Sequence, residues 1–224
     1  MKKIVLTMLT LSMILAGCSN SQQSPAETTV STQAAETAAT EASVTIYPLP
    51  DTTMDTLENA TIAISLEEGD AYVDDTGVMQ MDVKVYTYDR FDMVDIANLK
   101  AGDILVTHAG EVEISSVERN ELGTIFINGG LDNGGFDLFS NDEGVYYEIG
   151  FSDVKNWYEV GEVTLRVSAD LEFRDNADPE KGEQIYFAGS FLVGEVTDYH
   201  FTPHNTTIRT EDGQIVSMER IYTP

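Results

Sequence analysis

The stretch Val163-Thr164-Leu165-Arg166-Val167-Ser168-Ala169-Asp170-Leu171-Glu172-Phe173 decides the fold class, because apolar and polar residues alternate along it without a break. Successive side chains of a β-strand point to opposite faces of a sheet, so this pattern predicts a long, half-buried strand, with room for a bend. Residues 78–88 repeat the alternation, with Met79, Met81, Val83 and Val85 on one face. Together the two stretches predict an all-β fold.

Turn residues separate these stretches at strand-like intervals. Asn, Asp and Gly tolerate the positive φ angles that tight hairpins need. Such residues cluster at Asp75-Thr76-Gly77, Asn128-Gly129-Gly130, Asn133-Gly134-Gly135 and Asn141-Asp142-Glu143-Gly144. The clearest hairpin joins residues 206–210 to 214–222, with Ile208, Ile215 and Ile221 available for a core. Only residues 93–99 and 152–157 are expected to form helices, both short. We therefore expect an antiparallel β-sandwich or a partly open β-barrel, as one body or two small lobes.

Residues 95–106 carry a local motif: a leucine, a small loop, Gly102-Asp103 and an apolar strand. This arrangement resembles the start of a core strand in many small β-barrels. The resemblance implies that Gly102 turns the chain and Asp103 bonds loop amides. It further implies that residues 104–106 enter the core. Because a fold hosts many functions, the motif indicates architecture and not activity.

The first eighteen residues have the layout of a secretory signal. Lys2 and Lys3 precede an apolar run to Ala16 that is shorter than the roughly 20 residues a membrane-spanning helix needs. Leu15-Ala16-Gly17-Cys18 resembles the lipobox of bacterial prolipoproteins. The resemblance implies removal of a signal peptide, residues 1–17, by cleavage between Gly17 and Cys18. It further implies a lipid thioether on Cys18 that anchors the protein to the cell membrane on its extracytoplasmic side.

The remaining chain divides into a tether and a body. Residues 18–45 begin with Cys18, the only cysteine, and continue in Ala, Thr, Ser and Glu with few large apolar residues. Such a composition cannot bury enough surface to offset the entropy of ordering, so a disordered tether is expected. Residues 46–224 form the acidic β-rich extracytoplasmic domain and are numerous enough to bury a core.

The charge balance limits the partners. The chain has 39 acidic and 12 basic residues, a net charge of −27. Nucleic acid is therefore not an expected partner, since its phosphates are bound through Lys and Arg. Cationic, glycan and protein ligands stay open. No phosphate loop or dinucleotide fingerprint occurs, and no cofactor is expected.

Two groups of residues are weighed as metal ligands, and neither leads to a predicted metal site. Residues 175–183 contain four carboxylates but lack the spacing of a calcium loop, so a solvated hairpin loop is favoured. Asp132 with Asn133, and Asn141 with Asp142, are weaker versions of that idea. The second group is His200 and His204, which are four residues apart but separated by Pro203; His108 is remote in the sequence.

No catalytic residue is predicted. Gly189-Ser190-Phe191 lacks the Gly-x-Ser-x-Gly elbow that carries a serine nucleophile, and Cys18 is assigned to lipid. The aromatic residues Tyr146, Tyr147, Trp157 and Tyr158 suit stacking on a sugar or packing in a core, and packing is favoured. The sequence thus favours a non-enzymatic, membrane-anchored module that binds a ligand or partner. The alternatives are a carboxylate-based cell-wall or glycan hydrolase and a calcium-stabilised structural module.

Overall fold

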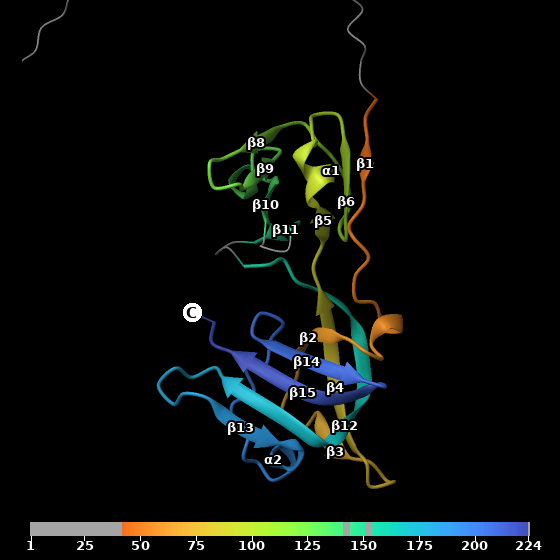
Figure 1. The fold of residues 1–224 in the computed structure, drawn as a ribbon, viewed down its shortest axis with the longest axis vertical. Coiled ribbons are helices and arrows are strands. Elements are labelled where there is room, and N and C mark those ends of the chain that lie inside the picture. The colour runs from red at the N-terminus through yellow and green to blue at the C-terminus, as the bar shows by residue number, and fades with distance from the viewer. Residues whose placement is uncertain (1–41, 141–143, 151–153, 224) are drawn as a thin grey trace, which may run out of the picture. The chain divides into compact units, whose positions relative to one another are not determined.

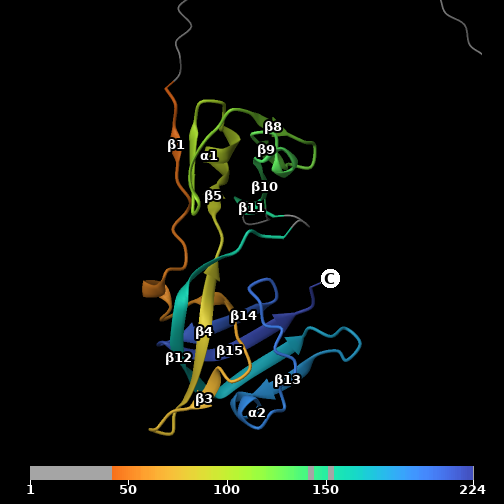
Figure 2. The same cartoon turned by 180° about the vertical axis from the view of Figure 1, so that it is seen from behind.

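The computed structural model describes residues 42–140, 144–150 and 154–223 (Figures 1 and 2). The signal peptide, Cys18, the tether up to residue 41 and the Asn141-Asp142 turn lie outside these ranges. Thr45, the last residue assigned to the tether, belongs to the first strand of the body.

The described residues are built from strands, which confirms the all-β prediction. The strands are β1 (Thr45–Ile46), β2 (Thr61–Ser65), β3 (Ala71–Val73), β4 (Met79–Thr87), β5 (Arg90–Asp92), β6 (Ile104–Thr107), β7 (Gly110–Glu113), β8 (Val117–Arg119), β9 (Ile125–Ile127), β10 (Phe136–Ser140), β11 (Val145–Ile149), β12 (Tyr158–Asn176), β13 (Gln184–Phe187), β14 (Thr206–Glu211) and β15 (Gln214–Ile221). The helices are α1 (Met93–Ala97) and α2 (Ala188–Leu192), with 3-10 turns η1 (Met54–Thr56) and η2 (Leu131–Asn133).

The largest sheet has seven strands in the order β13-β12-β15-β14-β2-β4-β3, and β12 also pairs with β4. The alternation predicted for β4 and β12 is present, since Met81, Val83, Val85 and Leu165 are buried. β12 also bends as expected, because its parallel pairing with β15 shifts register between Val167 and Glu172. We call the hydrophobic cluster of this sheet the larger core.

Two smaller sheets enclose a second cluster, which we call the smaller core. One sheet has the order β5-β11-β10-β9-β8 and the other β1-β6-β7. The resemblance of residues 95–106 to a barrel strand holds locally: Asp103 is buried and accepts hydrogen bonds from the backbone N–H of Val44 and Lys100. These bonds fix the start of the body against β6.

Apart from β1, the strands of the smaller core lie within the sequence of the larger one. The chain leaves the larger sheet at the end of β4, builds β5 to β11, and returns at the start of β12 (Figure 1). β4 and β12 pair directly, with Thr87 opposite Tyr158. Residues 88–89, 150 and 154–157 therefore lie between the two cores, and we call them the junction.

The predicted C-terminal hairpin is confirmed, with one correction. β14 and β15 pair antiparallel, and Asp212 and Gly213 both have positive φ, as a tight turn requires. Ile208 and Ile215 are buried as expected, whereas Ile221 at the end of β15 is 47% exposed. The prediction was wrong for Ile221 because the next residues leave the sheet.

The helix predictions were right in one place and wrong in another. Residues 93–97 form α1, which Asp92 caps by accepting a hydrogen bond from the backbone N–H of Val94. Of residues 152–157, the described ones are not helical, and Lys155 forms an isolated β-bridge with Ile149. α2 was not predicted, since it is a single short turn. Within the described part of the chain, no helix has the length and apolar character needed to span a membrane.

Candidate functional site at the junction

Asp89 is a buried carboxylate at a position where the sheet pattern calls for an apolar side chain. The buried face of β4 runs through Val83, Val85 and Thr87 and continues to Asp89, whose side chain is 2% exposed. Burying a charged group is costly unless it gains hydrogen bonds or an opposite charge. The partners of Asp89 therefore show what this position is for.

Asp89 accepts three hydrogen bonds, two of them from His108. Its Oδ2 lies 2.7 Å from the backbone N of His108 and 3.0 Å from the Nδ1 of the same residue, which lies in the turn between β6 and β7. Its Oδ1 accepts the third bond from the hydroxyl of Tyr158, at 3.3 Å. Because an ionised carboxylate can only accept, Nδ1 carries the proton, and the Nε2 of a neutral His108 presents a lone pair.

The imidazole is held by packing as well as by hydrogen bonds. The rings of His108 and Tyr158 stack with centroids 4.1 Å apart and planes 14° from parallel. The His108 side chain is nevertheless 28% exposed, so its free edge can reach a ligand from solvent. The position of the ring is thus set before any ligand arrives.

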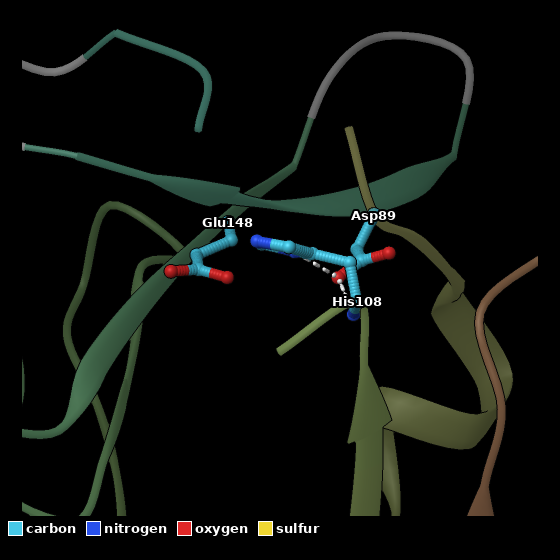
Figure 3. A group of neighbouring side chains, drawn as sticks. All are labelled: Asp89, His108 and Glu148. Atoms are coloured by element: carbon cyan, nitrogen blue, oxygen red, sulfur yellow. Dashed lines mark hydrogen bonds and ion pairs between the residues drawn. The ribbon is translucent and has the colours of Figure 1, made fainter. Parts of the chain in front are cut away.

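Glu148 supplies a second carboxylate on the other side of the imidazole. It lies on β11, and Figure 3 shows the His108 ring between the two carboxylates, with a ring nitrogen turned toward Glu148. Asn156 donates a hydrogen bond from its Nδ2 to the Oε1 of Glu148 at 2.9 Å. The junction residue Asn156 therefore orients Glu148, as Asp89 orients His108.

The environment alters the acidity of two of these groups. Burial raises the pKa of Glu148, and the nearby charge of Asp89 adds to the rise, while Asn156 and His108 oppose it. Burial also raises the pKa of Tyr158 to about 12, with the negative charge of Asp89 contributing. Tyr158 is thus a neutral hydrogen-bond donor at physiological pH.

The three side chains form a candidate metal site. One ligand atom from each of Asp89, His108 and Glu148 lies within 4.8 Å of the others. Imidazole and carboxylate are common ligands of Zn²⁺ and related divalent ions, and metal-bound histidines often donate their second N–H to a carboxylate. In the residues that the structure describes, no other group of His, Cys, Asp and Glu meets the same distance criterion.

An acidic cavity elsewhere has a different character. It has a volume of about 530 Å³ and opens on the polar face of β4 and β12, lined by carboxylates that include Asp70, Asp82 and Glu162. Each of these is engaged locally: Asp70 accepts from the backbone N of Glu67, Asp82 from the hydroxyl of Thr164, and Glu162 pairs with Lys84. These three carboxylates of the cavity therefore already have hydrogen-bond or ion-pair partners within the protein.

The loop at residues 175–183 is a hairpin between β12 and β13, as favoured from the sequence. Asp175 is buried and pairs with Arg220, and Asp178 pairs with Lys181 at 3.1 Å. Two of the four carboxylates thus have protein cations as partners. Asp132 lies in η2, and the side chain of Asn133 donates to the backbone of Gly129.

His200 and His204 do not come together at a metal site. His200 pairs with Asp198 and its side chain is 92% exposed, and His204 is exposed on the following turn. Ser190 lies in α2, where its hydroxyl donates to Glu195 at 2.7 Å. That bond orients Ser190 within the helix.

The aromatic residues named from the sequence have separate roles. Tyr146 packs against the smaller core and Tyr158 stacks on His108. Tyr147 and Trp157 both contact Tyr88, in edge-to-face pairs with centroids 5.8 and 4.7 Å apart. Tyr147 and Trp157 belong to neither hydrophobic core cluster, so the expectation of core packing was wrong for these two.

Sequence reasoning missed Asp89 and Glu148 and set His108 aside as remote. One signal for Asp89 was available, because the alternation of residues 79–87 extends to position 89 and places a carboxylate on the buried face. Nothing local indicates that Glu148 and His108 meet. Comparison with protein-family models, with curated proteins and with solved structures finds no match to this chain.

Proposed function

We propose that this chain is a lipid-anchored binding protein on the extracytoplasmic side of the membrane, and that its body binds a divalent transition-metal ion such as Zn²⁺. His108 Nε2 and a Glu148 oxygen bind the ion, and Asp89 positions His108. The observation that carries the proposal is the placement of His108 between two carboxylates, bonded to one and open toward the other.

The composition of the site favours a transition metal over calcium. Calcium takes six to eight oxygen ligands, whereas an imidazole nitrogen beside a carboxylate suits zinc and its neighbours. The formal charge of −27 attracts cations to the protein at long range. Both features support a cationic ligand, which the sequence left open.

The same geometry argues against the hydrolase alternative at this site. A glycoside hydrolase needs two carboxylates that reach the glycosidic bond. The Asp89 side chain is 2% exposed, and both of its oxygens accept hydrogen bonds from His108 or Tyr158. Asp89 thus orients another residue and is not placed to meet a sugar.

Metal binding is tested by calorimetric titration of the mature protein with ZnCl₂, with His108→Ala and Glu148→Gln as variants. We expect one zinc per chain and a loss of affinity of at least about 100-fold in either variant, because each removes a direct ligand. The matched control is His200→Ala, which removes an exposed histidine paired with Asp198. Unchanged binding in His108→Ala, or loss in His200→Ala, would overturn the assignment. Stabilisation by calcium but not zinc would favour the calcium-stabilised module instead.

The anchor is tested separately by metabolic labelling with a radioactive fatty acid. We expect label in the wild-type chain and none in Cys18→Ala, which removes the thiol that the lipobox resemblance assigns to lipid. Equal labelling of both chains, or none in either, would refute the anchor and leave the metal assignment standing.

A further inference from the structure

A second set of residues, from the junction and from β11, surrounds a cation. The ammonium nitrogen of Lys155 lies 4.4 Å from the ring centroid of Tyr88, 5.5 Å from that of Tyr147 and 5.7 Å from that of Trp157. It also donates a hydrogen bond to the Tyr88 hydroxyl at 3.1 Å. A cation within about 6 Å of an aromatic ring is attracted by the negative face of the ring. We call the three aromatic residues the aromatic box.

The aromatic box lies outside both hydrophobic cores of the described residues. None of its three rings belongs to the larger or the smaller core. All three side chains, and that of Lys155, are half-buried and therefore accessible from solvent in part. Large aromatic side chains usually bury their surface in a core, so three of them gathered outside both cores suggest a role in recognition.

The charge environment makes the position of Lys155 unusual. The chain has 39 acidic residues and 12 basic ones, yet Lys155 forms an ion pair with no carboxylate of the described residues. Its ammonium lies among aromatic rings instead. The position of Lys155 shows that the aromatic box accommodates an ammonium group in a chain where carboxylates are abundant.

The aromatic box is distinct from the proposed metal site although it lies close in sequence. Tyr147 immediately precedes Glu148 on β11, and neighbouring side chains of a strand leave opposite faces. One face of β11 thus contributes a carboxylate to the metal site, and the other contributes a ring to the aromatic box.

We propose that Tyr88, Tyr147 and Trp157 form a binding site for an organic ammonium group, and that Lys155 occupies this site when no ligand is bound. The lysine stem is flexible, so its ammonium can move into water and leave the rings to another cation. The exchange replaces one ammonium by another. A quaternary ammonium is favoured because it is the class that aromatic cages recognise.

The test measures binding of choline to the mature protein by calorimetry and by the fluorescence of Trp157, the only tryptophan. A chelator is present throughout, so the result does not depend on the metal site. The neutral analogue 3,3-dimethylbutan-1-ol is the ligand control, because it matches choline in shape without the charge. We expect Lys155→Ala to bind choline at least about tenfold more tightly than the wild type, and the alcohol at least about tenfold more weakly than choline.

Two further measurements complete the test. Tyr147→Ala in the Lys155→Ala background should abolish choline binding, because it removes one ring of the box. In the wild type, the Lys155 ε-methylene protons should shift on addition of choline as they leave the aromatic rings, and this NMR measurement decides the question if Lys155→Ala does not fold. Equal binding of choline and the alcohol, or no binding by a folded Lys155→Ala chain and no shift in the wild type, would overturn the proposal.

Discussion

Two buried aspartates in different regions of the molecule have different kinds of partner. Asp175, beside the larger core, forms a two-pronged ion pair with Arg220, whose guanidinium also lies 4.4 Å from the ring centroid of Phe201. Asp89, at the junction, is bonded instead to His108 and Tyr158. Arg220 presents a planar guanidinium that bonds both oxygens of a carboxylate, whereas His108 presents an imidazole with a second ring nitrogen that can bind a metal ion.

The difference teaches how to separate a structural carboxylate from a positioning one. In the Asp175–Arg220 pair both carboxylate oxygens are bonded to the guanidinium, and Arg220 itself is 2% exposed. Asp89 instead fixes the proton of His108 on Nδ1 and leaves Nε2 available. The first arrangement stabilises a fold, and the second prepares a ligand.

The largest effect is expected from breaking the structural pair. Arg220→Met leaves Asp175 buried without its cation, which should lower the free energy of unfolding by about 3–5 kcal/mol, measured by urea denaturation. The control is Arg209→Ala, which removes an exposed partner of Glu211 and should cost less than about 1 kcal/mol. Similar losses in the two variants would show that burial of the Asp175 pair has no special role.

The second prediction concerns the two aspartates directly. Asp89→Asn keeps the shape of the side chain but weakens the hold on His108, so zinc affinity should fall about 10–100-fold in a calorimetric titration. Asp175→Asn should leave zinc affinity unchanged in the folded protein. If the two variants had equal zinc affinity, Asp89 would have no positioning role.

The third prediction is an opposite pH dependence in the two regions. The folded-state pKa of Glu148 is raised, mainly by burial, so its contribution to stability is present at low pH and is lost as pH rises through that pKa. The pKa of Asp198, which contacts Arg220, is lowered, chiefly by its hydrogen bond with His200. The contribution of Asp198 to stability is therefore present above the ordinary carboxyl pKa and is lost as pH falls.

Glu148→Gln should therefore gain melting temperature relative to wild type as pH rises from about 4 to 7. Asp198→Asn should lose melting temperature relative to wild type as pH rises from about 2 to about 4, by a smaller amount because Asp198 is half exposed. Changes of the same sign would contradict the assigned causes.

The smallest effect is optical. Zinc binding at Glu148 should alter the emission of Trp157, because Asn156 lies next to Trp157 and donates a hydrogen bond to Glu148. The change should be absent in Glu148→Gln and in His108→Ala. A change that persisted in both variants would place the ion elsewhere.

The sequence predicted the parts of the fold that depend on local pattern. The alternation of β4 and β12 and the turn residues of the β14–β15 hairpin each act within a few residues. The parallel pairing of β12 with β15 was not predicted, since it joins Arg166 to Gln214 across a long stretch of chain. Ile221 was misplaced because its exposure depends on where the sheet ends.

The candidate site escaped prediction for the same reason. Asp89 and His108 are 19 residues apart, and Glu148 is distant from both in sequence. Their meeting depends on the register of β11 against β5, where Tyr147 lies opposite Arg90. No motif records such a register. A buried acid at the end of an apolar alternation was the one signal that a reader of the sequence could have used.

The placement of β5 to β11 between β4 and β12 also affects the order of folding. All buried residues of the smaller core lie between Ile46 and Leu138, whereas β4 needs β12 beside it, and β12 begins only at Tyr158. A chain that emerges from its N-terminal end can therefore complete the smaller core while the edge of β4 still lacks that neighbour. Unpaired strand edges are sites of aggregation, so slow delivery of residues 158–221 would be the vulnerable interval in the biogenesis of this protein.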